Sequence, residues 1–208
     1  MVGCPHPSYL QEMRPYAPII SFLLAAITAS VLPAQGPLQA APSGRGTTEV
    51  TITLVDSAAR AAAKPSILRV DYGQPHLRGR RILTDSLIPY DKVWRTGANA
   101  PTTLKSDVDL VIGGANLPKG TYILSTLPSR SGWKLLIQKE PTQPPVPDSP
   151  YDVSREVARI DLKQTTLAAP IESLTMWLIP ARGPGAPRGQ LIIAWSNLSL
   201  AADWMVKQ

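Results

Sequence analysis

Turn-forming residues interrupt this chain about every eight to twelve residues from residue 49 onward, which constrains its fold more than any other feature. The chain also contains 22 prolines, and a proline inside a helix removes a backbone hydrogen bond and clashes with the preceding turn. Long helices are therefore excluded. Short strands joined by tight turns are typical of antiparallel sandwiches and barrels. We expect an all-β protein with a single antiparallel β-sandwich, and the pattern is also compatible with barrel-like closure.

Alternation of apolar and polar residues marks the expected strands, because successive side chains of a strand point to opposite faces. The expected strands cover residues 50–54, 67–72, 102–106, 108–112, 121–127, 133–138, 157–162, 172–179, 190–196 and 198–206. An alanine-rich segment over 57–64 predicts one helical turn, and the prolines of 140–152 predict a loop. The sequence has no strand–helix–strand alternation, phosphate-binding loop or fixed-period repeat. Residues 49–208 thus predict one domain.

The first 34 residues have the pattern of a secretory signal peptide. Their apolar run over 16–32 is too short and too interrupted for a membrane span, which needs about 20 apolar residues. We interpret Met13 as the true start, because Arg14 then gives the peptide a positive charge directly before the apolar run. Residues 35–48 are expected to form a flexible linker. We therefore expect a periplasmic or secreted protein without a stable membrane span after cleavage.

The histidine and cysteine content restricts the chemistry of the domain. Cys4 and His6 lie in the leader, so His76 is the single histidine of the predicted domain. This excludes disulfides, thiol chemistry and a histidine-rich metal site, and we expect neither a metal nor a cofactor. A Ser–His–Asp hydrolase could only use His76, but no Gly-x-Ser-x-Gly elbow surrounds any serine. We interpret His76 as a surface residue. Carboxylates are numerous, but no spacing marks two of them as a glycosidase pair.

The net charge of +6 belongs to the predicted mature domain, because Glu12 cancels Arg14 in the leader. A basic surface can attract nucleic acid, anionic glycans or anionic lipid. No run of lysine and arginine exceeds two residues, which favours scattered surface charges over a nucleic-acid interface. Together with export, this pattern predicts no nucleic-acid partner. The partners that remain are an envelope glycan or an anionic small molecule.

The stretch over residues 72–99 combines glycines, prolines, arginines and large aromatics, as chains do where the backbone turns sharply around specific contacts. One interpretation is a sheet corner, in which an arginine binds backbone carbonyls and a tryptophan fills the core. The other is a ligand pocket with an aromatic platform and arginines that hold an anionic group. We favour the sheet corner, and the candidate ligand-binding residues of the second interpretation are Tyr72, Arg80, Tyr90, Trp94, Arg95 and Asn99.

These residues also carry a resemblance to a known family. The order Asp71-Tyr72, Gly79-Arg80, Pro89-Tyr90 and Trp94-Arg95-Thr96-Gly97-Ala98-Asn99, continuing through Gly120-Thr121-Tyr122 and Trp133, resembles the bacterial exported domain-of-unknown-function family DUF2911. The resemblance implies an exported β-sandwich protein with no established reaction, substrate or cofactor. Family members often have a glutamate after the equivalent of Asn99, where this chain has Ala100-Pro101. Any chemistry that depends on that glutamate would be missing here.

We therefore expect a binding or structural module of the cell envelope rather than an enzyme. The alternative is an envelope hydrolase that acts on a glycan or another anionic substrate near residues 72–99. One geometric criterion separates the two: convergence of Trp94, Arg95 and Asn99 with Tyr72 and a carboxylate on an open concavity would support a site. Burial of Arg95 with its donors bound to backbone carbonyls would support the sheet corner.

Overall fold

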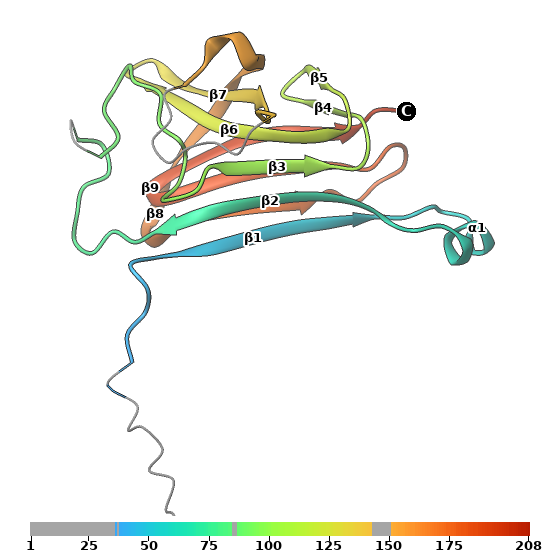
Figure 1. The fold of residues 1–208 in the computed structure, drawn as a ribbon, viewed down its shortest axis with the longest axis horizontal. Coiled ribbons are helices and arrows are strands. Elements are labelled where there is room, and N and C mark those ends of the chain that lie inside the picture. The colour runs from blue at the N-terminus through green and yellow to red at the C-terminus, as the bar shows by residue number, and fades with distance from the viewer. Residues whose placement is uncertain (1–35, 37, 85–86, 143–150) are drawn as a thin grey trace, which may run out of the picture. The chain divides into compact units, whose positions relative to one another are not determined.

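The computed structural model describes residues 36, 38–84, 87–142 and 151–208 (Figure 1). The predicted signal peptide and the interpreted start at Met13 lie outside these residues. Residues 40–208 form one compact unit.

Nine antiparallel strands form the described part of the domain, which confirms the expected all-β class. They pair in the order β1-β2-β3-β6-β7-β8-β9-β4-β5. A short helix, α1, follows β1, and a 3-10 turn, η1, precedes β8. The bounds are β1 Ser43–Ile52, α1 Ser57–Ala62, β2 Ser66–Pro75, β3 Thr102–Ser106, β4 Leu110–Ile112, β5 Ala115–Leu117, β6 Gly120–Ser129, β7 Gly132–Lys139, η1 Val153–Arg155, β8 Glu156–Pro180 and β9 Arg188–Val206.

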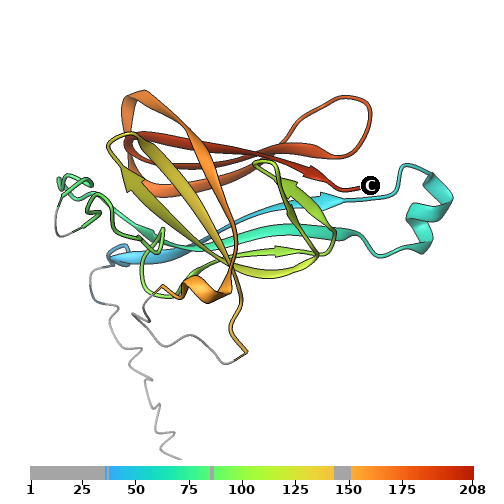
Figure 2. The same ribbon diagram turned by 90° about the horizontal axis from the view of Figure 1, so that it is seen from above.

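Strand β8 passes from one layer, which contains β1, β2, β3, β6 and β7, to the other, which contains β9, β4 and β5 (Figure 2). It pairs with β7 up to Leu162 and with β9 from Lys163 onward. The prediction of two separate strands at 157–162 and 172–179 was wrong, because the chain stays extended between them. Pro170, which has no backbone N–H, falls between Thr166 and Ile171, where the pairing register shifts.

The second half of β8 lies against β1 and β2, which stand at the other end of the strand order. Gln74 Nε2 donates a hydrogen bond to the carbonyl of Leu174 at 3.1 Å. The amide of Leu178 donates to Thr48 Oγ1 at 3.0 Å. His76, directly after β2, forms an isolated bridge with Ser173. The two layers therefore meet along this line, which gives the sandwich a barrel-like closure.

Strand β1 begins at Ser43, inside the segment expected to be linker, so that boundary was placed too late. It pairs with β2 along its whole length, from Ser43 opposite Pro75 to Ile52 opposite Ser66. Small residues in this segment suggested flexibility, but backbone pairing orders them. Gly46 also has a specific role, since a Cβ there would lie 2.5 Å from the ring of Tyr72.

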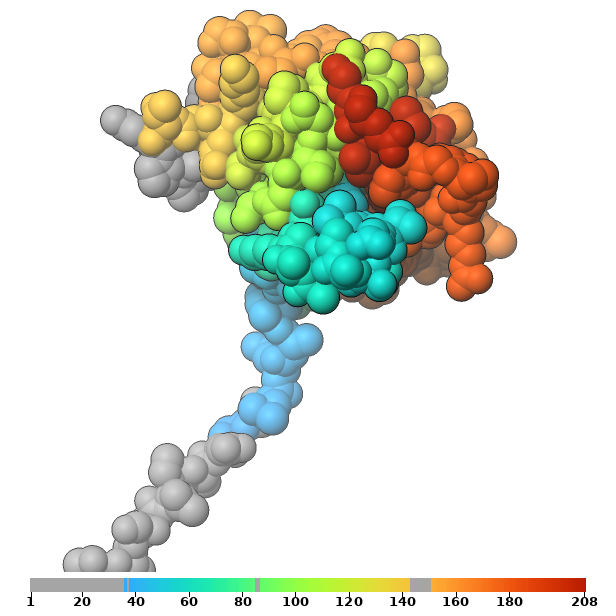
Figure 3. All heavy atoms as spheres, turned by 90° about the vertical axis from the view of Figure 1, so that its right-hand side faces the viewer, coloured from blue at the N-terminus to red at the C-terminus, as the bar shows by residue number. Residues whose placement is uncertain are grey.

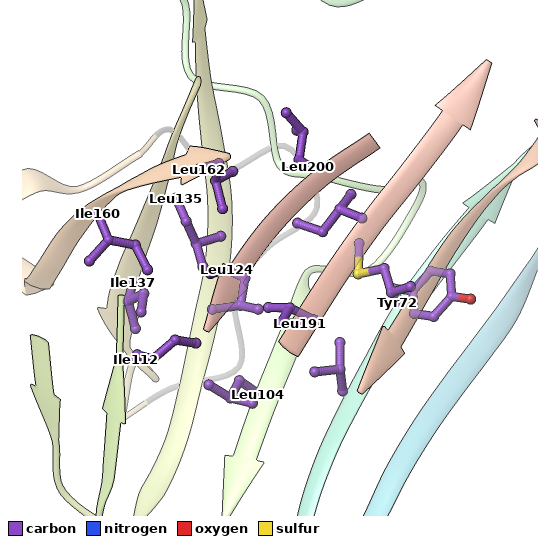
Figure 4. Packing of buried hydrophobic residues seen from close by; sticks show 14 of the residues in the cluster. Tyr72, Leu104, Ile112, Leu124, Leu135, Ile137, Ile160, Leu162, Leu191 and Leu200 are labelled. Carbon is purple, nitrogen blue, oxygen red and sulfur yellow. The ribbon is translucent and has the colours of Figure 1, made fainter. Parts of the chain in front are cut away.

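One apolar cluster fills the space between the layers (Figure 4). Each fully buried aliphatic side chain contributes about 1.5–3 kcal/mol relative to an exposed one. The cluster includes Leu68, Val70 and Tyr72 of β2, Leu104 of β3, Leu124 of β6, Leu135 and Ile137 of β7, Ile160, Leu162 and Leu174 of β8, and Leu191, Leu200 and Trp204 of β9. Every layer contributes to this single core, as expected of one domain.

Candidate functional site

Trp94 is held between two strands. Its backbone bridges to Thr126 of β6, with both N–H to carbonyl distances at 2.8 Å. Its half-buried ring stacks on Trp195 of β9, with ring centroids 6.0 Å apart and planes inclined by 13°. Trp94 therefore ties the segment before β3 to both β6 and β9.

The turn after Trp94 is built on buried threonines. Thr96 is fully buried and has a φ of +54°, which is costly for a β-branched residue. Its Oγ1 lies 3.1 Å from the Trp94 carbonyl and 3.0 Å from Thr126 Oγ1. Thr102 Oγ1 donates to the Thr96 carbonyl at 2.8 Å. These bonds hold the unusual backbone in place, as expected of a sheet corner.

The arginine and asparagine candidates bind backbone carbonyls. Arg80 donates to the carbonyls of Leu77, at 3.1 Å, and His76, at 2.7 Å. Arg95 Nη1 donates to the Asn99 carbonyl at 3.3 Å. Asn99 Nδ2 in turn donates to the carbonyl of Ser43 at 3.4 Å. The carbonyl contacts agree with the sheet-corner interpretation, whereas the burial expected of Arg95 is not seen, because Arg95 is exposed.

The two tyrosine candidates have different surroundings. Tyr72 is only 3% exposed and belongs to the core, where its ring covers Gly46. Tyr90 is exposed, and the guanidinium of Arg130 lies 5.1 Å from its ring centroid, within cation–π range. Of the six candidates, the contacts described here bring Arg95 and Asn99 together, whereas Tyr72, Trp94, Tyr90 and Arg80 each have separate partners.

A depression of about 540 Å³ lies outside residues 72–99. It is found where β8 ends and β9 begins, beside β4. It is lined by Val111, Gly114, Ile179, Pro180, Ala181, Arg188, Gly189, Gln190, Asp203, Trp204 and Met205. Figure 3 views the end of the molecule where the C-terminal strand lies beside the loop that precedes β9. There the amide of Val206 donates to the carbonyl of Pro187 at 2.7 Å.

The depression combines an apolar lining with a few polar groups. Ile179 and Met205 are 47% and 41% exposed, which leaves apolar surface in contact with water. Arg188 Nη1 donates to the Pro184 carbonyl at 2.8 Å, which positions the guanidinium. Hydrogen bonds from Gln190 Nε2 and Lys163 Nζ, each 2.9 Å long, lower the pKa of Asp203.

Trp204 has a hydrogen-bond donor without an acceptor. The residue is 2% exposed, and its indole Nε1 is buried with no partner among the described residues. Buried side-chain donors are normally paired, and an unpaired one costs about 1–3 kcal/mol. Sequence reasoning missed this site, because its lining comes from four separate segments. A free indole N–H also leaves no sequence signal.

His76, interpreted from the sequence as a surface residue, is partly exposed and partly buried. Its Nδ1 lies 2.7 Å from Ser173 Oγ, and its Nε2 lies 3.2 Å from the Ala41 carbonyl. Within the described ranges, no three histidine, cysteine, aspartate or glutamate side chains are grouped to hold a metal. No helix in the described part of the chain is long and apolar enough to cross a membrane.

The sequence profile of a family described as "Protein of unknown function (DUF2911)" matches residues 56–203. The chain belongs to this family. The resemblance carried by Trp94–Asn99 is thereby confirmed. No curated protein and no solved structure matches the chain. The DUF2911 match covers the sheet corner and most of the depression, whereas β1 precedes it.

Proposed function

We propose that this DUF2911 protein is an exported binding module of the cell envelope that holds a small anionic amphiphile in the depression beside β4. The observation that carries the proposal is the apolar depression itself, which is edged by the exposed side chains of Ile179 and Met205 and by the positioned guanidinium of Arg188.

The shape and lining favour a small molecule with an apolar part. Ligand sites usually measure about 300–1,000 Å³ and are mostly apolar with a few polar groups, and this depression fits that description. A bound hydrocarbon would cover the exposed surfaces of Ile179 and Met205. Removing apolar surface from water contributes about 25 cal/mol per Å².

The charges favour an anionic head group. Arg188 lines the depression, and its side chain is already positioned by the Pro184 carbonyl, so less entropy is lost when it binds a ligand. The one lining carboxylate, Asp203, is paired with Lys163. Because its pKa is lowered, Asp203 is ionised at neutral pH and is a poor general acid. Binding therefore explains this depression better than acid–base hydrolysis does.

A panel of single-chain probes tests the proposal. Dodecanoate and decyl phosphate should raise the melting temperature of the full chain, whereas dodecyltrimethylammonium should not. Ile179→Ser and Arg188→Gln should each weaken probe binding about tenfold, which corresponds to about 1.4 kcal/mol. Val157→Ser and Arg182→Gln are matched controls, because these residues are exposed and lie outside the lining.

Two outcomes would contradict the placement of the site. Equal binding by the Ile179 and Arg188 variants would remove the depression from consideration. Loss of binding on replacement of Arg80 and Arg95 alone would place the ligand at residues 72–99. The envelope location rests separately on the predicted signal peptide. It is tested by fusing residues 1–48 to a reporter that is active only after export.

A further inference from the structure

His76 and Ser173 form a hydrogen-bonded pair on the line where the two layers meet. Their backbones face each other in an antiparallel bridge, and His76 Nδ1 lies 2.7 Å from Ser173 Oγ. Both residues are half-buried, so the pair is reachable from solvent yet held within the sheet.

The second nitrogen of His76 fixes which atom carries the proton. Nε2 lies 3.2 Å from the carbonyl of Ala41, and a carbonyl can only accept a hydrogen bond. In the neutral ring Nε2 therefore carries the hydrogen and Nδ1 is the acceptor. Ser173 must then donate its hydroxyl hydrogen to Nδ1. This is the arrangement of a serine that can transfer its proton to a neighbouring base.

The backbone around the pair is held from both sides. The amide of Leu77 donates to the carbonyl of Glu172 at 2.7 Å, and the amide of Arg78 donates to Glu172 Oε1 at 2.8 Å. Arg80 Nη2 binds the carbonyl of His76 at 2.7 Å. Such fixed geometry lets a base accept a proton without reorganisation. The carboxylate of Glu172 accepts a hydrogen bond from the backbone amide of Arg78. The group that orients the His76 ring is therefore the Ala41 carbonyl.

We propose that Ser173 is a nucleophile and His76 its general base, and that the pair cleaves carboxylic esters with an anionic part. Ser173 Oγ bonds to the ester carbonyl carbon as its proton moves to His76 Nδ1. The carbon–alkoxy bond then breaks, and the departing alkoxide takes that proton and leaves as an alcohol. Water, deprotonated by His76, cleaves the acyl-serine bond, which releases the acid and restores the hydroxyl of Ser173.

The anionic part of the substrate is inferred from charge. Exposed Arg78 and Arg81 belong to the loop that directly follows His76, and they give this region a local positive potential. The pair is distinct from the depression, because Ser173 lies six positions before Ile179 on the same strand, about 20 Å away at the usual rise. Failure of one proposal therefore leaves the other intact.

A fluorophosphonate probe tests this on the folded full chain, since it forms a stable bond only with a serine whose proton is taken by a base. We expect mass spectrometry to find the probe on Ser173 and not on Ser131, an exposed serine without a histidine partner. His76→Gln should slow labelling of Ser173 at least a hundredfold, as expected when a general base is lost. Ser173→Ala should abolish both labelling and hydrolysis of 4-nitrophenyl succinate.

The proposal is overturned if the native chain leaves Ser173 unlabelled under conditions that label a known serine esterase. Labelling that proceeds equally fast in His76→Gln would also overturn it, because the histidine would then be a structural partner only. His76→Asn provides a second variant, and melting temperatures separate loss of the base from loss of the fold.

Discussion

Gly73→Ala tests whether the turn after Trp94 is packed against β2 as described. A Cβ at position 73 would lie 1.7 Å from the carbonyl oxygen of Ala98 and 2.6 Å from its carbonyl carbon. Non-bonded carbon and oxygen atoms need about 3.2 Å or more, so one of the two backbones must move by about 1.5 Å. That shift would break the hydrogen bond from the Ala98 amide to the Gly73 carbonyl, 3.3 Å long.

The expected cost follows from these two effects. Overpacking of this kind costs about 1–3 kcal/mol, and the lost hydrogen bond about 0.5–1.5 kcal/mol. Alanine also lowers the conformational entropy of the unfolded chain, which stabilises the variant by about 0.4–1 kcal/mol. We therefore expect a loss of about 2–3 kcal/mol in the free energy of unfolding. For a domain of this size the melting temperature would fall by about 4–12 °C.

Gly44→Ala is the matched control, because Gly44 lies on β1 and a Cβ there would meet no atom within 4 Å. It should be neutral or slightly stabilising. Urea denaturation of both variants, followed by tryptophan fluorescence and circular dichroism, gives the two free energies. If Gly73→Ala costs less than about 0.5 kcal/mol, the close approach of Ala98 and the sheet-corner account are refuted.

Two further predictions concern stability. Trp94→Ala removes the stack on Trp195 and should cost about 2 kcal/mol in a denaturation experiment. Trp177→Ala, at a 38% exposed position on β8, should cost less than about half of that, and equal costs would contradict a role for the stack. Glu156→Gln should cost about 0.5–1 kcal/mol at pH 7, because hydrogen bonds from Arg159 lower the pKa of Glu156. A lowered pKa means that this stabilisation is present above the unfolded value of about 4.3 and is lost as the pH falls through the folded value. The difference from wild type should therefore vanish in acid, and Asp161→Asn, whose side chain is 83% exposed, should cost almost nothing at pH 7.

The strands that were predicted correctly are those whose alternation ends at a clear turn. Residues 102–106 match β3 because Pro101 precedes them and apolar and polar side chains alternate along them. The segment 163–171 was missed, because its mostly exposed residues show no alternation of apolar and polar side chains. Its extended form depends on pairing with β9, a partner remote in sequence.

For the candidate ligand residues, too, local sequence patterns predicted only part of what the structure shows. Leu68, Val70 and Tyr72 alternate with Arg69 and Asp71 in the sequence and so share one face of β2, and that face is the core. The pattern therefore already favoured a structural role for Tyr72 over a ligand platform. The depression could not be predicted, because it depends on how the β8–β9 hairpin ends beside β4. Likewise, no local pattern places His76 beside Ser173, since 97 residues separate them.

Indole N–H signals in a nitrogen-15 NMR titration test the central claim most directly. The chain has five tryptophans, so five indole signals are expected, and Trp204→Phe identifies the signal of Trp204. The partners of Trp195 and Trp204 differ, since Trp195 Nε1 already donates to the Glu172 carbonyl at 3.2 Å. On addition of dodecanoate, the Trp204 signal should move most, because Trp204 lines the depression. Movement of the Trp94 and Trp195 signals while that of Trp204 stays fixed would contradict the depression as the binding site.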